Sequence, residues 1–305
     1  MRLVTRSDFD GLGCAAVLKE LGELEDIKFV HPKDIQDGII DITENDILTN
    51  IPYVKGCGMW FDHHSSEIER KEFDEFEGKS DPSAPSAARV VYEYYGGLEK
   101  FQNTHLDDLV CAVDKADMGD FTKEEILNPD GWVLLSFVMD PRTGLGRYKD
   151  YRISNYSLME DMIDYCREKT AEEILEVPDV KERTFRYFEQ DKIFREMILE
   201  NSTVHDNVVV LDLRDQEEIY TGNRFMIYSL FPEQNVSCQI MWGFRKQNIV
   251  ITCGYSIIKR DATTDVGSLM LKHGGGGHKR VGTCQIDVDK ADQVLQEIID
   301  ELNGK

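Results

Sequence analysis

Apolar and polar positions follow two different spacings in the first part of the chain. Short apolar runs predict strands, and between them apolar residues recur at the spacing of one helix face. The predicted strands cover residues 2–5, 27–30, 47–49 and 58–61, and the predicted helices cover residues 12–21, 83–95 (with Ser83 as N-cap) and 105–116. Strands that alternate with helices indicate an α/β fold, in which a parallel sheet carries helices on both faces.

The pattern changes in the second half of the chain. Residues 155–200 are charged and helical in spacing, and Pro178 divides them into two predicted helices that form a connector. Further apolar runs predict strands at 207–213, 224–230, 236–241 and 248–255, followed by a helix at 289–302. We therefore expect a first domain over residues 1–180 and a smaller α/β domain with a mixed sheet over residues 205–305.

The charge of the chain narrows the classes of partner. Its 305 residues carry a net charge of −23, whereas tight binding to long duplex DNA needs a basic surface. A short anionic ligand is still compatible, because a local basic pocket and a metal ion can overcome the general field. The acidic stretch at residues 67–77 is expected to be solvated.

Two further features concern the compartment. No apolar run is long enough to span a membrane, so no membrane partner is expected. The seven cysteines are scattered and form no CxxC pair, which favours reduced thiols. Together these features predict a cytoplasmic protein.

The strongest chemical signal is the run Asp62-His63-His64, which directly follows an apolar strand. A carboxylate and two imidazoles at a strand end favour a metal site, in which one imidazole binds the ion and its neighbour reaches a scissile phosphate. The alternative is a chance adjacency of two histidines. Ligands of this kind suit a divalent ion such as Mn²⁺ and metal-assisted attack on phosphorus.

Other polar residues are candidates for the same site. Asp8 and Asp10 lie on a strand-to-helix turn, although an Asp-rich turn that only caps the helix is the alternative. Asn50 follows a predicted strand, and the carboxyl ends of parallel strands share one edge of the sheet. Asp117 ends a helix, where a carboxylate opposes the helix dipole unless a cation offsets it. For Asp114, three residues earlier, a salt bridge or solvent exposure is expected instead.

A second signal is a glycine-rich run that ends in basic side chains. The run consists of Gly274, Gly275, Gly276 and Gly277, followed by His278, Lys279 and Arg280. Consecutive glycines let backbone N–H groups approach an anion, and the basic side chains add charge-assisted hydrogen bonds to phosphate. A flexible hairpin is the alternative. Arg142 is a further candidate, because it could add positive charge to one side of the substrate cleft. The alternative is an ordinary surface arginine.

Taken together, these motifs resemble those of the DHH phosphoesterase family. SDFDG resembles the first motif of the family, FDHHSS its namesake motif, KADMGD its fourth, and GGGGHKRVG the signature of the DHH-associated C-terminal domain. The resemblance runs from residue 8 to residue 282. The family includes RecJ-type exonucleases, oligoribonucleases (nanoRNases) that also dephosphorylate pAp, cyclic-dinucleotide phosphodiesterases and exopolyphosphatases. The size of the chain is similar to that of nanoRNase-like and exopolyphosphatase-related members.

The resemblance implies roles for individual residues. Asp8 and Asp10 would serve two different metal ions, usually Mn²⁺, and His64 would contact the substrate phosphate. The implied metal ligands are Asp8, Asp10, Asn50, Asp62, His63 and Asp117. The implied catalytic residues are Asp62, His63 and His64. The candidate substrate-binding residues are Gly274, Gly275, Gly276, Gly277, His278, Arg280 and Arg142.

Two positions differ from the family pattern. Small members usually carry a histidine four residues before the first Asp, where this chain has Val4. The second motif usually ends a strand with a bridging Asp, where this chain has Asn50, whose neutral amide oxygen is a weaker ligand. We therefore predict one tightly and one weakly bound Mn²⁺ ion, with Mg²⁺ as an alternative.

The implied function is that of a metal-dependent phosphoesterase acting on short oligonucleotides or nucleotide phosphoesters, as nanoRNases and pAp phosphatases do. Exopolyphosphatase or pyrophosphatase activity is one alternative, and a non-catalytic nucleotide-binding protein is another. The expected partner is a short anionic phosphate substrate, namely an oligonucleotide, a nucleotide or a polyphosphate. A homodimer is left open.

Overall fold

The computed structural model describes residues 1–64 and 76–304, so most of the acidic stretch at 67–77 lies outside the described residues. The chain forms two compact units. The first comprises Met1–Asp120 and Pro129–Tyr187, and the second comprises Phe121–Asn128 and Phe188–Lys305. Within the described ranges, no helix has both the length and the apolar character needed to cross a membrane.

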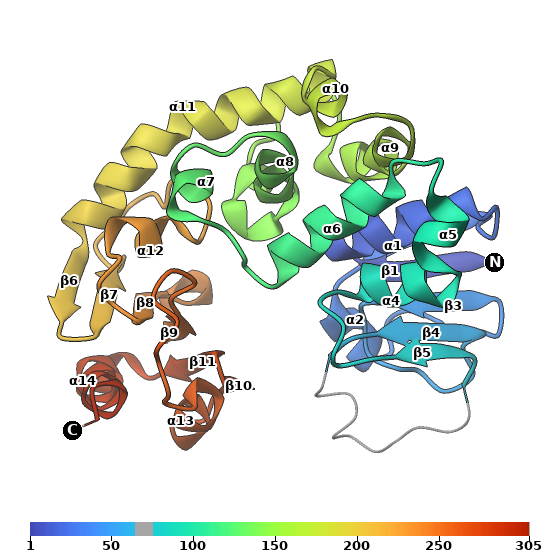
Figure 1. Ribbon diagram of the computed structural model, residues 1–305. Coiled ribbons are helices and arrows are strands. Elements are labelled where there is room, and N and C mark those ends of the chain that lie inside the picture. Colours follow the sequence, from blue (N-terminus) through green and yellow to red (C-terminus); the bar gives the residue numbers. More distant parts are fainter. Residues whose placement is uncertain (65–75, 305) are drawn as a thin grey trace. The chain divides into compact units, whose positions relative to one another are not determined.

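The first unit contains a five-stranded sheet in which all strands are parallel (Figure 1). Its strands are β1 (Arg2–Arg6), β2 (Asp26–Val30), β3 (Asp46–Thr49), β4 (Met59–Asp62) and β5 (Gly78–Ser80), in the order β2-β1-β3-β4-β5. The four predicted strands are all present. The short edge strand β5 was not predicted, because its sequence has no apolar run.

Helices cover both faces of this sheet, as predicted. The helices of this unit are α1 (Phe9–Glu20), α2 (Pro32–Gln36), α4 (Ala87–Tyr94), α5 (Gly97–Phe101), α6 (Leu106–Asp117), α8 (Gly131–Met139), α9 (Asn155–Glu168) and α10 (Ala171–Leu175), with 3-10 turns η1 (Pro141–Thr143) and η2 (Leu145–Arg147). Helix α1 is buried along most of its length and packs against α4, α6 and α9. On the other face, Ile35 of α2 packs with Val4, Leu48 and Trp60.

The start of helix α4 differs from the prediction. Its N-cap is Ser86, whose Oγ accepts a hydrogen bond from Arg89 N at 3.0 Å. Ser83, the predicted cap, instead donates from Oγ to Asp81 Oδ1 at 2.6 Å. The helix therefore begins later than expected, where a serine and the carboxylate of Asp10 satisfy the free N–H groups of its first turn.

The connector contains three helices rather than two. After α9, Thr170 caps α10 in a capping box with Glu173, and this break was not predicted. Pro178 is the first residue of α11 (Pro178–Glu200), so it separates helices as expected. Helix α11 begins in the first unit and ends in the second.

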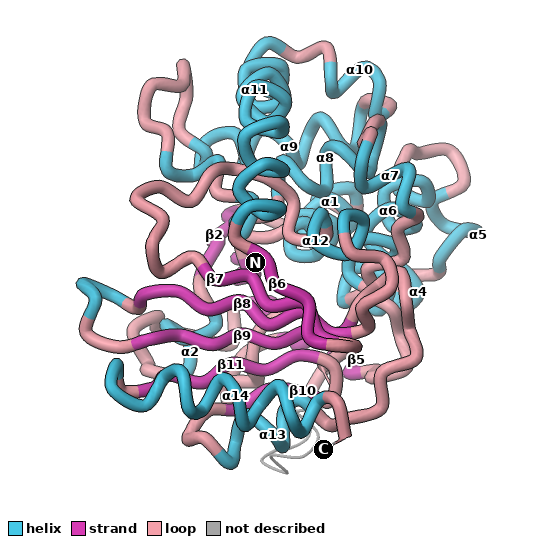
Figure 2. Tube along the Cα trace, turned by 90° about the vertical axis from the view of Figure 1, so that its left-hand side faces the viewer, coloured by secondary structure: helices cyan, strands magenta, loops and turns pink. Residues whose placement is uncertain are grey.

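The second unit is built on a six-stranded mixed sheet (Figure 2). Its strands are β6 (Ser202–His205), β7 (Val208–Asp212), β8 (Val236–Trp242), β9 (Ile249–Tyr255), β10 (Gly276–His278) and β11 (Val281–Ile286), in the order β10-β11-β9-β8-β7-β6. Only β7 and β8 are parallel among the described pairs. Helices α13 (Val266–Lys272) and α14 (Ala291–Leu302) share one apolar core with the sheet.

Two predictions for this unit are wrong. Residues 224–230 form helix α12 (Met226–Leu230) instead of a strand, because a continuous apolar run fits a buried helix as well as a buried strand. Residues 121–128, assigned to the first domain, pack in the second unit and include α7 (Lys123–Leu127). There the Phe121 and Phe225 ring centroids lie 5.4 Å apart. The remaining short turns are η3 (Phe244–Lys246) and η4 (Val288–Lys290).

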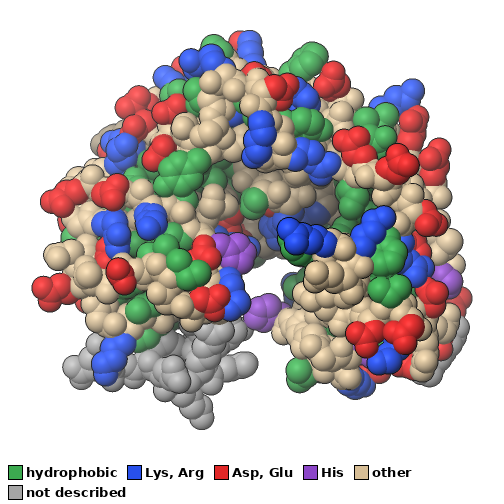
Figure 3. Space-filling view, turned by 180° about the vertical axis from the view of Figure 1, so that it is seen from behind, with side chains coloured by type: hydrophobic (Ala, Val, Ile, Leu, Met, Phe, Trp, Pro, Cys, Tyr) green, Lys and Arg blue, Asp and Glu red, His purple; other side chains and the backbone are tan. Residues whose placement is uncertain are grey.

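Figure 3 shows one face of the molecule with its side chains coloured by type. On the face shown in Figure 3, acidic and basic side chains are interspersed. On the face in view, no broad basic area is present among the described residues to follow a long duplex backbone.

Candidate metal centre

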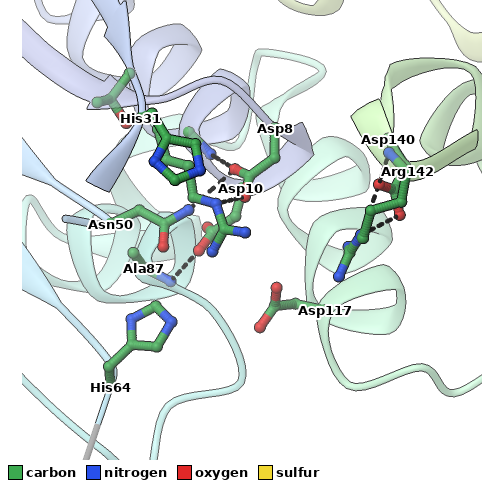
Figure 4. A network of polar contacts seen from close by, with 12 residues as sticks. Asp8, Asp10, His31, Asn50, His64, Ala87, Asp117, Asp140 and Arg142 are labelled. Atoms are coloured by element: carbon green, nitrogen blue, oxygen red, sulfur yellow. Dashed lines mark hydrogen bonds and ion pairs between the residues drawn. The ribbon is translucent and has the colours of Figure 1, made fainter. Parts of the chain in front are cut away.

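The predicted site residues of the first unit gather at the carboxyl edge of its parallel sheet. Asp8 follows β1, Asn50 follows β3 and Asp62 is the last residue of β4, and the register of these strands aligns their ends. Figure 4 shows His64 and Asp117 beside the region that holds Asp8 and Asn50. The strand ends therefore bring together side chains that are distant in the sequence.

The N-terminus of α4 holds the carboxylate of Asp10 in place. Asp10 is buried, and its two oxygens accept hydrogen bonds from Ala87 N at 3.0 Å and Ala88 N at 2.7 Å. Burial, together with the nearby charges of Asp117 and Asp8, raises the pKa of Asp10 well above its ordinary value, although the two amides partly offset this. Carboxylates that repel one another in this way create a strong local demand for a cation.

His63 presents an unpaired nitrogen to the same point. Its Nδ1 lies 3.3 Å from the carbonyl oxygen of Ala84, which can only accept, so a neutral ring would carry its proton on Nδ1 and a lone pair on Nε2. Nε2 is buried and has no hydrogen-bond partner among the described residues. It lies 3.7 Å from Asp10 Oδ2 and 3.4 Å from Asp117 Oδ2.

These distances define a three-residue cluster of Asp10, His63 and Asp117. One donor atom from each residue lies within 4.8 Å of the other two. The two carboxylate oxygens and the imidazole nitrogen are ligands that Mn²⁺ and similar divalent ions accept. The Ala84 carbonyl and the α4 amides supply the outer hydrogen bonds that orient such ligands. The donor set therefore fits a divalent metal ion.

Asp62 and His64 form a separate pair beside this cluster. His64 Nδ1 lies 2.8 Å from Asp62 Oδ1, and the carboxylate is completely buried. Burial alone would lower the pKa of His64, but the hydrogen bond to Asp62 and the charges of Asp62, Asp10 and Asp117 raise it to about 9. His64 is therefore a charged hydrogen-bond donor at neutral pH. The structure places Asp62 in contact with His64 and not within the three-residue cluster.

Asp8 and Asn50 also lie outside the cluster and contact each other. Asp8 Oδ1 accepts hydrogen bonds from Gly11 N and from Asn50 Nδ2, each at 3.0 Å. Asp8 Oδ2 forms an ion pair with Arg6 Nε at 2.8 Å. Asn50 adopts a left-handed backbone conformation (φ 55°), which asparagine tolerates better than most residues. The first acidic residue of the sequence motif is thus held by nitrogen donors.

Three residues near the site were not anticipated from the sequence. Arg6 is the last residue of β1, His31 directly follows β2, and Asp140 precedes η1. Asp140 Oδ1 accepts hydrogen bonds from Arg142 N at 2.9 Å and Arg142 Nε at 2.8 Å. The only sequence signal for Arg6 and His31 is their position at the carboxyl ends of strands.

The structure brings Arg142 close to the site and makes Asp114 a structural residue. Burial lowers the pKa of Arg142, but Asp140 and the charges of Asp8 and Asp117 raise it overall. Figure 4 shows Arg142 beside Asp117. Asp114 forms an ion pair with Arg89 and accepts a hydrogen bond from Ser86 Oγ at 2.6 Å, so the expected salt bridge is confirmed.

The glycine-rich run forms a hairpin in the second unit, and a hairpin was the alternative to an anion-binding loop for this run. β10 pairs with β11 around the turn at Lys279 and Arg280. A Cβ at Gly275 would lie 2.1 Å from Thr283 O, and one at Gly277 would lie 2.2 Å from Val281 O, so close strand pairing requires these glycines. Gly276 has no neighbour within 4 Å of its would-be Cβ. The side chains of His278 and Arg280 are exposed.

Comparison with known proteins identifies the family. The chain is similar to the solved structure of PggH, a pGpG-specific phosphodiesterase from Vibrio cholerae, with 50% sequence identity, a TM-score of 0.87 and coverage of 99% of both chains. It also shares its fold with RecJ from Thermus thermophilus in complex with Mn²⁺ (12% identity, TM-score 0.52, all of this chain and 52% of RecJ) and with Mg²⁺ (13% identity, TM-score 0.52, all of this chain and 50% of RecJ). No family model and no curated protein matches the sequence significantly.

The chain therefore belongs to the DHH family of phosphoesterases and is a phosphoric ester hydrolase. This agrees with the family predicted from the sequence motifs. The similarity covers 99% of each chain, so it spans both units of the structure.

Proposed function

We propose that the protein hydrolyses the phosphodiester bond of short 5′-phosphorylated dinucleotides, with pGpG as the preferred substrate and mononucleotides as products. The observation that carries this proposal is the 50% identity to a pGpG-specific phosphodiesterase over 99% of both chains. The acidic net charge is compatible with a short anionic substrate and unfavourable for a long one.

Asp10, His63 and Asp117 would hold the tightly bound ion, with Mn²⁺ as the expected metal and Mg²⁺ as the alternative. The unpaired, buried Nε2 of His63 supports this assignment, because a buried nitrogen without a partner is unfavourable unless a ligand occupies it. When bound, a divalent ion supplies Lewis-acid catalysis to phosphoryl transfer. Before any ion binds, the Ala84 carbonyl and the α4 amides already hold two of these side chains in place.

His64 would donate a hydrogen bond to an oxygen of the scissile phosphate and a proton to the leaving 3′-oxygen. Its raised pKa keeps the imidazole protonated, and Asp62 fixes the ring orientation through Nδ1 so that Nε2–H is available to the substrate. Arg142, held by Asp140, would add a second positive charge near the phosphate. Asp62 is then a positioning residue.

The glycine-rich hairpin would bind the part of the substrate away from the scissile bond. Gly276 leaves space for a ligand to approach the backbone, and the exposed side chains of His278 and Arg280 can donate to a terminal phosphate. Gly274 gives the chain a left-handed turn just before the hairpin (φ 76°). The predicted substrate-binding role of these residues is part of this proposal.

A substrate panel tests the proposal. The protein would be incubated with Mn²⁺ and pGpG, pApA, pAp, cyclic di-GMP or tripolyphosphate, and the products would be separated by chromatography. We expect GMP from pGpG at the highest kcat/KM, and loss of turnover in His63→Ala. Faster release of inorganic phosphate from tripolyphosphate would instead indicate an exopolyphosphatase, and binding of pGpG without turnover would indicate a non-catalytic member.

A further inference from the structure

Resting on the proposed function, we propose that the guanidinium of Arg6 takes the place of one of the two metal ions that the family pattern implies. The enzyme would then work with a single ion at Asp10, His63 and Asp117. This inference follows from a contrast between two sets of residues at the same sheet edge. One set includes a buried nitrogen without a partner among the described residues, His63 Nε2, and the other is held by an arginine and further nitrogen donors of the protein.

Both oxygens of Asp8 have nitrogen partners within the protein. Oδ1 accepts hydrogen bonds from Gly11 N and Asn50 Nδ2, and Oδ2 pairs with Arg6 Nε at 2.8 Å. By contrast, Nε2 of His63 has no partner among the described residues. An ion at Asp8 would have to compete with a cation that is covalently part of the chain.

The neighbouring positions also lack the donors that a second ion needs. Val4 is completely buried in an apolar cluster with Leu48 and Trp60, so it offers no ligand. Asn50 turns its amide nitrogen toward Asp8, and a donor group facing a carboxylate suits hydrogen bonding rather than shared metal binding. Asp62 is paired with His64. The residues at this position therefore do not fit a second metal ion.

Arg6 can supply a positive charge and hydrogen-bond donors to the substrate phosphate in place of the second ion. It lies at the carboxyl end of β1, two residues beyond Val4 and therefore on the same face of the strand. Its side chain is 37% exposed, and its ion pair with Asp8 is formed through Nε. A planar guanidinium that uses Nε for Asp8 still has Nη donors for a phosphate oxygen. Arg6 is thus a positioning residue for Asp8 with donors to spare.

Metal stoichiometry tests the inference without relying on turnover. Metal-free protein would be equilibrated with Mn²⁺, with and without a non-hydrolysable phosphorothioate analogue of pGpG, and bound manganese would be counted by mass spectrometry. We expect one ion per chain in both cases, with the electron paramagnetic resonance signal of an isolated Mn²⁺ ion. Two ions per wild-type chain, or the signal of a coupled pair, would overturn the inference. If pGpG is not a substrate, this count remains informative.

Substitutions at the site provide the second test. Arg6→Gln combined with Asn50→Asp removes the cation and restores a carboxylate, so we expect the count to rise to two ions per chain. Arg6→Gln alone should lower kcat about 100-fold, as loss of one preorganised donor does, while the ion at His63 is retained. Arg6→Lys should recover part of that loss. An Arg6→Gln variant with unchanged kcat would contradict the proposed role.

Arg2 provides a matched control on the same strand. It pairs with Asp46 through Nε–Oδ1 at 2.6 Å, at the opposite end of β1 from the site. Arg2→Gln also removes an arginine–aspartate ion pair, so it measures the general cost of that loss. We expect Arg2→Gln to lower the melting temperature but to leave the manganese count and kcat per folded molecule unchanged.

Discussion

The Nε2 atom of His63 lies 3.4 Å from Oδ2 of Asp117, although one residue follows strand β4 and the other ends helix α6. Asp117 is 40% exposed on its side chain, whereas Asp10, the third member of the cluster, is 2% exposed. The cluster therefore has a buried, rigidly held side and a side open to solvent. Its open side is where a metal ion would enter.

Removal of the Asp117 charge should separate metal binding from stability. Because the charge of Asp117 raises the pKa of buried Asp10, the two carboxylates destabilise the metal-free protein. We expect Asp117→Asn to stabilise the metal-free protein by about 1 kcal/mol and to abolish the rise in melting temperature that Mn²⁺ causes in wild type. Differential scanning calorimetry with and without Mn²⁺ measures both effects. His205→Ala, in the second unit, is the control that should retain the Mn²⁺ response.

Asp62 should act on the reaction only through His64. Asp62→Asn keeps the shape of the side chain but removes the negative charge that orients His64 and raises its pKa. We expect kcat to fall about 100-fold in Asp62→Asn and in His64→Gln, and the double variant to be little worse than either. Steady-state kinetics on pGpG with a double-mutant cycle measures this coupling. Fully additive losses would show that the two side chains act independently.

The ion pair between Arg2 and Asp46 should set part of the acid stability. Burial tends to raise the pKa of Asp46, but hydrogen bonds from Arg2 and Thr43 lower it overall below its ordinary value of 3.8. A lowered pKa means that the pair stabilises the fold above about pH 3.8, and that this stabilisation is lost as the pH falls through the folded-state pKa.

Asp46→Asn tests this pH dependence. We expect the variant to lose about 2 kcal/mol of unfolding free energy at pH 7, because a buried charged hydrogen bond is lost. At pH 3 the difference from wild type should become smaller. Urea unfolding at both pH values measures it, and an equal difference at pH 3 and pH 7 would mean that Asp46 does not titrate between them.

Two neighbouring glycines should respond differently to alanine. A Cβ at Gly275 would lie 2.1 Å from Thr283 O, so Gly275→Ala should destabilise the hairpin by several kcal/mol. Gly276 has free space around its Cα, so Gly276→Ala should fold normally and raise KM for pGpG at least several-fold by obstructing the substrate. Melting temperature and KM separate the two effects. An unchanged KM in Gly276→Ala would mean that the hairpin is not the substrate-binding element.

The α/β fold was predictable because the spacing of apolar residues alternates between that of strands and that of helices. Tertiary contacts decide where each element begins and ends. The failures have specific causes. Residues 224–230 are apolar without alternation, so their sequence could not distinguish a buried helix from a strand. The true cap of α4 is Ser86 rather than Ser83, and the choice depends on the distant carboxylate of Asp10, which bonds the first turn.

The candidate site was predictable only in its side-chain donors. Asp8, Asn50 and Asp62 could be placed at one edge because each ends or follows a strand, and the structure confirms that placement. The sequence could not show that Asp8 would contact Asn50 while Asp62 would contact His64. The carbonyl of Ala84 is a backbone atom with no sequence signature, and Arg6 resembles any polar residue at the end of a strand.

The two hydrogen bonds from Ala87 and Ala88 to Asp10 give one side chain two duties. In a relative that has lost hydrolytic activity, His63 or Asp117 could be replaced with little effect on stability. Replacement of Asp10 would also remove the two hydrogen bonds that stabilise the beginning of α4. We therefore expect His63 or Asp117 to be replaced before Asp10 in such relatives. The presence of Asp10 alone is then weak evidence that a relative is an active enzyme.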